Sequence, residues 1–165
     1  MSLGAALFIG FLVVQRLGEL VLARRNTQAL LADGAREVDA DHYLLIVALH
    51  VAWIASIALL GYDKAVVVGW LAMFALLQLF RLWILAALGR RWTTRIIVTG
   101  TPLVARGPFH FMRHPNYTLV VCEIAVAPLV LGLWQVALVF SVLNAAVLII
   151  RIRAEDRALA LYRTD

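Results

Sequence analysis

The sequence is poor in several residue types on which common protein chemistries depend. It contains a single cysteine, Cys122, and a single lysine, Lys64, among 165 residues. One cysteine excludes an internal disulfide and the zinc sites that are built from several thiolates. The net charge of +5 comes without a long basic run, so the composition does not indicate binding to nucleic acid. Residues 1–23 lack the basic start and the Ala-x-Ala end of a cleavable signal peptide, so we expect a retained membrane span.

Apolar residues, in contrast, make up 64% of the chain, and the mean hydropathy is +0.91. A soluble domain of this size cannot bury so much apolar surface, so we expect an integral membrane protein. Its fold class is expected to be all-α and polytopic, because unpaired backbone groups cannot face lipid. The length fits one domain over residues 1–165. Five apolar segments predict the transmembrane helices, the last two joined as a tight hairpin: Leu3–Ala23, Tyr43–Leu60, Ala65–Leu88, Tyr117–Leu133 and Val136–Ile152.

The basic residues outside these spans gather on one side of the predicted topology. With five spans, the first connection, the third connection and the C-terminal end share a side, and Lys64 lies on the other. By the positive-inside rule the C-terminus is then cytoplasmic and the N-terminus is outside. The basic residues on the predicted cytoplasmic side are Arg24, Arg25, Arg36, Arg90, Arg91, Arg95, Arg106, Arg113, Arg151, Arg153, Arg157 and Arg163.

The third connection, "RRWTTRIIVTGTPLVARGPFHFMRHPNY", alternates short apolar stretches with Gly-Thr-Pro and Gly-Pro turns. Its pattern is too ordered for a disordered linker, and its apolar runs are too short for another span. A connection of this length in a compact protein is usually functional, so we expect it to fold against the cytoplasmic face.

This connection ends in Arg113-His114-Pro115, directly before an apolar run. Proline is favoured at the first position of a helix, so Pro115 is expected to begin the fourth helix. The free N–H groups at that end favour an anion, and the guanidinium of Arg113 suits a carboxylate. The alternative is that Arg113 only contacts lipid headgroups.

Charged residues also occur inside the predicted spans. Glu123 follows Pro115 by eight residues, which places it ~12 Å deep in the membrane. An ionisable residue at this depth is expensive and indicates a functional role by default. Arg16, Glu19 and Arg81 lie at comparable depth, so we expect them to pair with Glu123. A purely structural network of ion pairs is the alternative.

At the end of the fifth span, Glu155 and Asp156 directly follow the apolar run. Their carboxylates suit a ligand ammonium group or ribose hydroxyls, although a solvated helix end would have the same composition. Together with Arg113 and the start of the fourth helix, they describe a polar pocket beside apolar walls. S-adenosylmethionine carries these polar groups and a sulfonium, and methyl transfer mainly requires alignment and removal of water.

The motifs "GPFHFMRHPNY" and "RIRAEDRAL", with Glu123 and Pro128 between them, resemble the isoprenylcysteine carboxyl methyltransferase family, including its short bacterial members. The related phospholipid methyltransferases share the Gly-Pro and Arg-His-Pro-x-Tyr pattern. The resemblance covers about residues 90–162 and implies a helical membrane fold that uses S-adenosylmethionine and releases S-adenosylhomocysteine. It further implies O-methylation of a lipophilic acceptor, which is prenylcysteine-like, alkylpyrone-like or another lipid.

Carried over residue by residue, the resemblance implies two groups of site residues. Arg113 would orient the acceptor or cofactor, and Glu123 would line the reaction chamber, which makes these two the predicted catalytic residues. No metal is implied. The predicted cofactor-binding residues are Leu103, Gly107, His114, Pro115, Tyr117, Glu155 and Asp156.

Three other functions fit parts of the sequence. Membrane sterol and enone reductases, which use NADPH, also carry Arg-His-Pro-Asn-Tyr, but they usually continue with Phe-Gly-Glu rather than Thr-Leu-Val. A non-enzymatic lipid-binding protein would have no use for Arg113 beside a buried Glu123. A metal or haem site on His50, His110 and His114 is disfavoured, because Gly107-Pro108 and Pro115 interrupt a helix through that region. The oligomeric state is left open.

Overall fold

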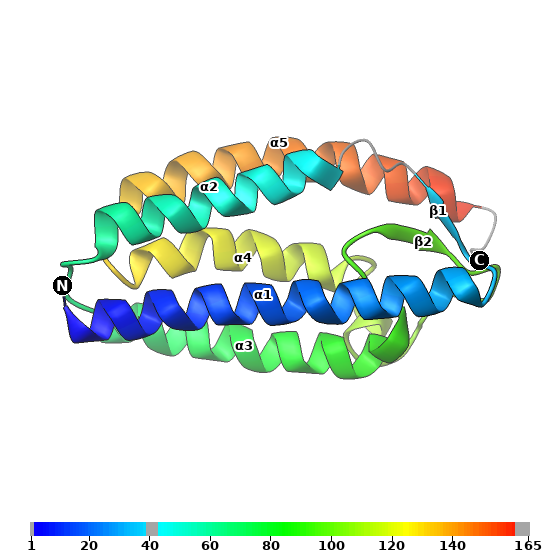
Figure 1. Ribbon diagram of the computed structural model, residues 1–165, viewed down its shortest axis with the longest axis horizontal. Helices are drawn as coiled ribbons and strands as arrows, with labels where there is room; N and C mark the ends of the chain where they lie inside the picture. Colours follow the sequence, from blue (N-terminus) through cyan, green and yellow to red (C-terminus); the bar gives the residue numbers. More distant parts are fainter. Residues whose placement is uncertain (1, 39–42, 161–165) are drawn as a thin grey trace.

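The computed structural model describes residues 2–38 and 43–160 of the chain, in which five α-helices dominate. They run side by side as an elongated bundle (Figure 1). This arrangement confirms the expected all-α polytopic membrane fold. The helices are α1 (Leu3–Ala32), α2 (Tyr43–Gly61), α3 (Val68–Leu88), α4 (Pro115–Leu129) and α5 (Trp134–Leu159).

Four of the helices are long and apolar enough to cross a membrane, namely α1, α2, α3 and α5. Helix α4 has 15 residues, or about 22 Å at 1.5 Å per residue, which is short of the ~30 Å hydrocarbon core. Helices α1 and α5 have 30 and 26 residues and extend well past the ends predicted for them. The protein is therefore an integral membrane protein in which one short helix, α4, lies among longer ones.

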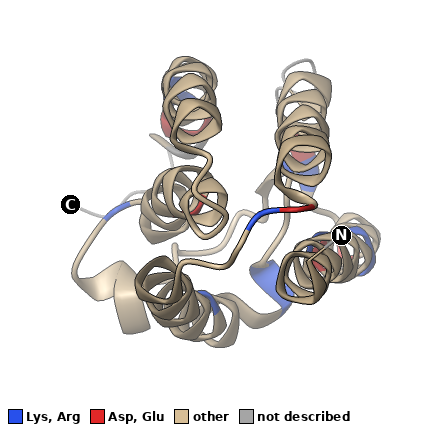
Figure 2. Ribbon diagram, turned by 90° about the vertical axis from the view of Figure 1, so that its left-hand side faces the viewer, with Lys and Arg blue, Asp and Glu red and all other residues tan. Residues whose placement is uncertain are grey.

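Helix α4 packs against both α5 and α3, so it occupies the middle of the bundle. Figure 2 shows the helices end-on, with uncharged residues along most of their lengths. The main core joins Leu12 of α1, Trp53 of α2 and Ile124 of α4, all of which are buried. The indole N–H of Trp53 donates to the carbonyl oxygen of Ile124 at 3.2 Å, so even the polar atom of this core is satisfied.

The predicted tight hairpin between the last two helices is confirmed. Helix α4 ends at Leu129, just after an internal proline, and α5 begins at Trp134. The backbone N–H of Leu133 donates to the carbonyl oxygen of Pro128 at 3.0 Å. Gly132 has φ +68° in this turn, a conformation that glycine adopts without steric cost.

The third connection folds across one end of the bundle, as expected. It contains the 3₁₀ helices η2 (Gly89–Arg91) and η3 (Gly107–His110) and strand β2 (Ile96–Val98). Strand β2 pairs antiparallel with β1 (Arg36–Val38), which follows α1. The sequence does not predict this pair, because strands of three residues are too short to show alternation. Nη1 of Arg95 donates to both carboxylate oxygens of Glu37, at 2.6 and 2.9 Å, and so joins the two connections.

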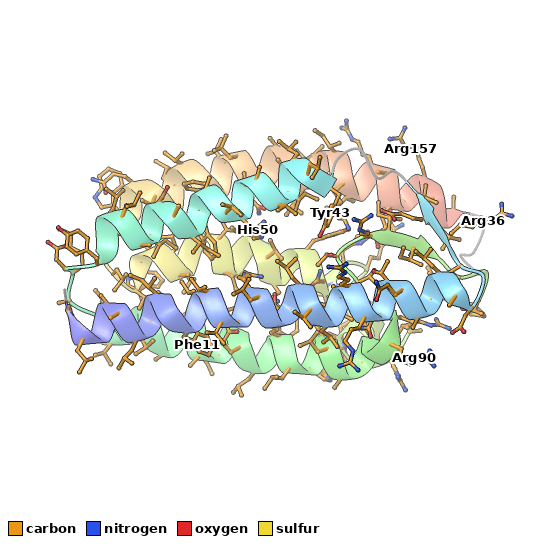
Figure 3. The ribbon with its side chains drawn as sticks, viewed as in Figure 1. Phe11, Arg36, Tyr43, His50, Arg90 and Arg157 are labelled. Atoms are coloured by element: carbon orange, nitrogen blue, oxygen red, sulfur yellow. The ribbon has the colours of Figure 1, made fainter. Side chains whose placement is uncertain are left out.

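Basic residues gather at the end of the bundle that carries this sheet, where Arg36, Arg90 and Arg157 are visible in Figure 3. Arg24 and Arg25 differ from their prediction, because they lie within α1 rather than in a connection. Arg163 lies outside the described residues. The asymmetry of charge agrees with the positive-inside pattern, and the cytoplasmic location of this end stays a prediction.

Candidate active site

A cavity of about 760 Å³ opens at the basic end of the bundle. Its outer part is covered by the third connection from Arg91 to Ala105, and its inner part lies between α1, α2, α4 and α5. Tyr43 and His50, both labelled in Figure 3, belong to its wall on α2. A cavity of this size is in the range that accommodates a small-molecule ligand.

Polar side chains from α4 and α5 meet at the outer part of this cavity. The Tyr117 hydroxyl donates to Oε2 of Glu155, which joins the first turn of α4 to the last turns of α5. Arg151 donates from Nε to the Tyr117 oxygen at 3.2 Å, and from Nη2 to the carbonyl oxygen of Thr94 at 2.6 Å. Arg151 is 7% exposed, so this one side chain fixes both helices to the third connection. We refer to Tyr117, Arg151 and Glu155 as the outer polar cluster.

His114 and Arg113 extend the outer polar cluster toward the solvent. The His114 ring stacks on Tyr117 with centroids 5.4 Å apart. Its Nε2 atom lies 3.3 Å from Oδ1 of Asp156, yet it is buried without a hydrogen-bond partner among the described residues. Nη2 of Arg113 lies 3.9 Å from the same Asp156 oxygen, and this side chain is 68% exposed. An exposed guanidinium with one distant carboxylate keeps donors available for a ligand.

The structure brings five of the nine predicted site residues to the cavity wall. They are Leu103, Arg113, His114, Tyr117 and Glu155. The other four do not line it: Gly107, Pro115, Glu123 and Asp156.

Two of these four have evident structural roles. Pro115 begins α4 as expected, after a non-helical His114 with φ −131° and ψ 62°. Gly107 has φ +61° and packs against α3, where a Cβ atom would lie 3.1 Å from Cβ of Ala87. Gly107 therefore sets the path of the third connection over α3, rather than forming part of the cavity wall.

Glu123 lies behind the cavity wall, in the network of ion pairs that the sequence predicted. It is 1% exposed, and its carboxylate accepts hydrogen bonds from both Nε and Nη2 of Arg81. Arg16 donates to Oε2 at 2.8 Å, and Gln78 donates to Oε1 at 3.0 Å. Glu19 completes the network through Arg81 at 2.6 Å and Arg16 at 3.0 Å. Two guanidinium groups and two carboxylates thus balance in charge, as buried ions require.

The expectation that Glu123 lines the reaction chamber therefore differs from the structure. Arg16, Glu19 and Arg81 do line the cavity, while Glu123 holds the two arginines from behind. The reason is geometric, since a single carboxylate that accepts from three side chains is enclosed by them.

Among the polar residues of the cavity wall that were not predicted as site residues are Arg151, Asn144 and His50. Arg151 was counted only as a basic residue of the C-terminal end, although its spacing of four from Glu155 was a visible signal. Asn144, in the middle of α5, lines the cavity and is 2% exposed. His50 lines the same cavity from α2. A lone polar residue in an apolar span was the available signal for both.

The structure does not gather metal-binding side chains in the part of the chain it describes. No group of three or more His, Cys, Asp or Glu residues is placed to hold an ion there. His110 ends η3, and residues 111–114 are not helical, so His110 and His114 do not share a helix face.

Comparison with known proteins gives the family. The model of the isoprenylcysteine carboxyl methyltransferase family matches residues 70–161, which include α4, α5 and the third connection. The chain belongs to this family. It is also 39% identical over 162 residues to YpbQ of Bacillus subtilis strain 168, which is described as uncharacterized. This match covers 94% of the chain and 96% of YpbQ. No solved structure matches the chain.

Membership in this methyltransferase family gives the cavity a coarse assignment. The matched region supplies the outer polar cluster and the third connection that covers it. The protein is thus a membrane methyltransferase by family, with its polar residues at the basic end of the bundle.

Proposed function

We propose that this protein transfers a methyl group from S-adenosylmethionine to an oxygen atom of a lipophilic acceptor. The observation that carries the proposal is a single cavity with two unlike parts. Its outer part holds Arg113, His114, Tyr117 and Glu155, and its inner part runs between α1 and α2, where most lining residues are apolar. A charged, water-soluble methyl donor and a lipid-soluble acceptor would meet where these two parts join.

The residues present fit the donor. The amino acid part of the donor carries a carboxylate, for which Arg113 and the N-terminal end of α4 provide donors. Glu155 and the buried Nε2 atom of His114, which lies 3.3 Å from Oδ1 of Asp156 without a hydrogen bond in the described residues, suit an ammonium group or ribose hydroxyls. When bound, S-adenosylmethionine supplies an electrophilic methyl group on a sulfonium. In this proposal the end of the bundle that carries these residues is cytoplasmic and the N-terminus is outside.

The acceptor would enter from the membrane. Leu17 of α1 and Val51 of α2 both line the cavity, and they are 57% and 62% exposed. An opening between these helices would let an apolar chain remain in lipid while its polar end enters the cavity. The prenylcysteine-like and alkylpyrone-like acceptors both have this form.

The residues of the outer part contribute alignment and the exclusion of water. Arg113 would hold the charged end of the donor, and the outer polar cluster would fix α4 against α5 around it. Glu123 would act at a distance, because it positions Arg16 and Arg81, which line the cavity. Holding two reactants in line accounts for much of the barrier reduction that such transfers need.

A titration calorimetry experiment tests the proposal and its main rival together. Purified protein in detergent is titrated with S-adenosylhomocysteine and, separately, with NADPH. We expect binding of S-adenosylhomocysteine alone, whereas binding of NADPH alone would support a reductase. Binding of neither compound would favour a non-enzymatic lipid-binding protein.

A second experiment identifies the product. The protein is incubated with S-adenosylmethionine labelled in its methyl group and a total lipid extract, and labelled lipids are separated. The expected label is in a methyl ether or methyl ester. Label on nitrogen or carbon would contradict transfer to oxygen.

A further inference from the structure

The inner end of the cavity contains polar atoms that the proposed function does not use. His50 lies seven residues into α2 from Tyr43, and Asn144 lies seven residues before Arg151 on α5. His50 therefore lies about 10 Å deeper than Tyr43, and Asn144 about 10 Å deeper than Arg151. Helix α2 packs against α5. Both side chains line the cavity, together with Arg16 of α1. We refer to Arg16, His50 and Asn144 as the inner polar site.

The hydrogen bonds of His50 fix the position of its proton. Nδ1 lies 2.9 Å from the carbonyl oxygen of Ile46, one turn earlier in α2. A carbonyl oxygen can only accept, so Nδ1 carries the hydrogen. In the neutral ring, Nε2 then carries a lone pair and can accept a hydrogen bond. The ring itself is held edge-on against Trp53, with centroids 6.2 Å apart.

Asn144 and Arg16 supply the opposite chemistry. Nδ2 of Asn144 and Nε of Arg16 are buried donors that lack a hydrogen-bond partner in the described part of the chain. An unsatisfied buried donor costs on the order of 1–3 kcal/mol, so such atoms are commonly explained by a ligand or a water. Two donors that line the same cavity as one basic nitrogen would match an oxygen atom that carries its own hydrogen.

The charges at this depth determine which kind of oxygen fits. Both Nη atoms of Arg16 are taken by Glu19 and Glu123, and Arg81 is paired with the same two carboxylates. The inner polar site therefore offers no uncompensated cation to an ionised carboxylate. A carboxylic acid, with a pKa near 4, would arrive ionised and would need no base. A phenol-like or enol-like hydroxyl is neutral and does need one.

We propose that the inner polar site binds the hydroxyl group of the acceptor, with Asn144 orienting its oxygen and His50 Nε2 accepting its proton. This inference rests on the proposed function and specifies its substrate class. The acceptor oxygen forms the new bond to the methyl carbon. The carbon–sulfur bond breaks, and its electron pair stays on sulfur. The O–H proton moves to Nε2 and then leaves through the polar outer end of the cavity.

The test uses two probes that differ only in the reacting group, 4-dodecylphenol and 4-dodecylbenzoic acid. We expect wild-type protein to methylate the phenol and not the acid. His50→Asn keeps a donor near Ile46 but removes Nε2, and it should slow transfer to the phenol on the order of 10²–10⁴-fold. Its affinity for S-adenosylhomocysteine should be unchanged. Ser56→Ala, a half-buried position on α2 whose hydroxyl donates to the carbonyl oxygen of Ala52, is the matched control and should transfer normally.

A more acidic acceptor tests whether His50 acts as a base or only supports the structure. With 2-nitro-4-dodecylphenol, which ionises near neutral pH, the defect of His50→Asn should shrink, because the acceptor no longer needs a base. A structural defect would be equal for both phenols and would overturn the role of His50.

Binding gives a readout that does not depend on turnover. Asn144→Leu should weaken binding of radiolabelled 4-dodecylphenol to protein saturated with S-adenosylhomocysteine by on the order of tenfold. Unchanged phenol binding would contradict the role of Asn144. Methylation of the acid alone, or of neither probe by protein that binds S-adenosylhomocysteine, would overturn the hydroxyl assignment. Failure to bind S-adenosylhomocysteine would overturn the proposed function itself.

Discussion

Tyr117 and Glu155 are 38 residues apart in the chain, and a hydrogen bond from the tyrosine hydroxyl to the carboxylate joins them at the mouth of the cavity. The bond fixes the start of α4 to the end of α5. The two helices also form the hairpin at the opposite end of the bundle, so they are tied together at both ends.

Loss of the Glu155 carboxylate is expected to weaken donor binding. Glu155→Ala removes both the partner of Tyr117 and a group proposed to contact the donor. A hydrogen bond to a charged group contributes about 1.5–3 kcal/mol, so the affinity for S-adenosylhomocysteine should fall on the order of 10- to 100-fold. Titration calorimetry measures this. Arg153→Ala, an exposed change two positions earlier on α5, should leave the affinity unchanged, and equal losses in both variants would contradict the prediction.

Arg113→Ala should abolish most methyl transfer while leaving the fold intact. The side chain is 68% exposed, so its removal costs little stability. Without Arg113 the charged reactant would no longer be held in position, and a misplaced reactant lowers kcat/KM by about 10²-fold or more. Transfer of a labelled methyl group into lipid extract is the measurement. Arg90→Ala removes a similarly exposed arginine that pairs with Asp33, and its activity should match wild type. Near-normal turnover by Arg113→Ala would show that it only contacts headgroups.

Glu123→Gln should destabilise the protein strongly. It leaves Arg16 and Arg81 buried with Glu19 as their remaining carboxylate, and breaking such a pair costs about 3–5 kcal/mol. Thermal unfolding in detergent should show a large drop in Tm. Adding Arg81→Met restores the balance of charge, so the double variant should be more stable than Glu123→Gln alone. Additive losses would show that the balance of charge is not what matters.

Activity in the same variants tests how Glu123 acts. If it works through Arg16 and Arg81, transfer should fall in Glu123→Gln even at temperatures where the protein is fully folded. Normal turnover below the unfolding transition would leave Glu123 a purely structural role.

Gly107→Ala should lower stability through the backbone rather than the cavity. The residue has φ +61°, and an added Cβ would approach Ala87 and Trp83 at 3.1 and 3.3 Å. A non-glycine residue in this conformation costs on the order of 1–2 kcal/mol. The midpoint of thermal unfolding measures the effect. Gly69→Ala, inside α3 with no atom within 4 Å of the added Cβ, should be neutral or slightly stabilising. A loss as large at Gly69 would refute the explanation.

The sequence determined the membrane fold and much of the polar network. Apolar runs must form helices in lipid, because every backbone group has to be satisfied within its own segment. Pro115 predicted the start of α4, since its ring suits the first turn of a helix. The pairing of Glu123 with Arg16 and Arg81 was also predictable, because charges at that depth have no other way to be stabilised.

Only the tertiary structure decided which side chains face the cavity. Glu123 is enclosed by its partners, Gly107 packs on α3, and Asn144 and His50 line the cavity. Helical spacing alone does not give the rotation of one helix against another when nearly every face is apolar. The relative rotation is set by side-chain packing between α2, α4 and α5, which depends on contacts between residues far apart in the chain.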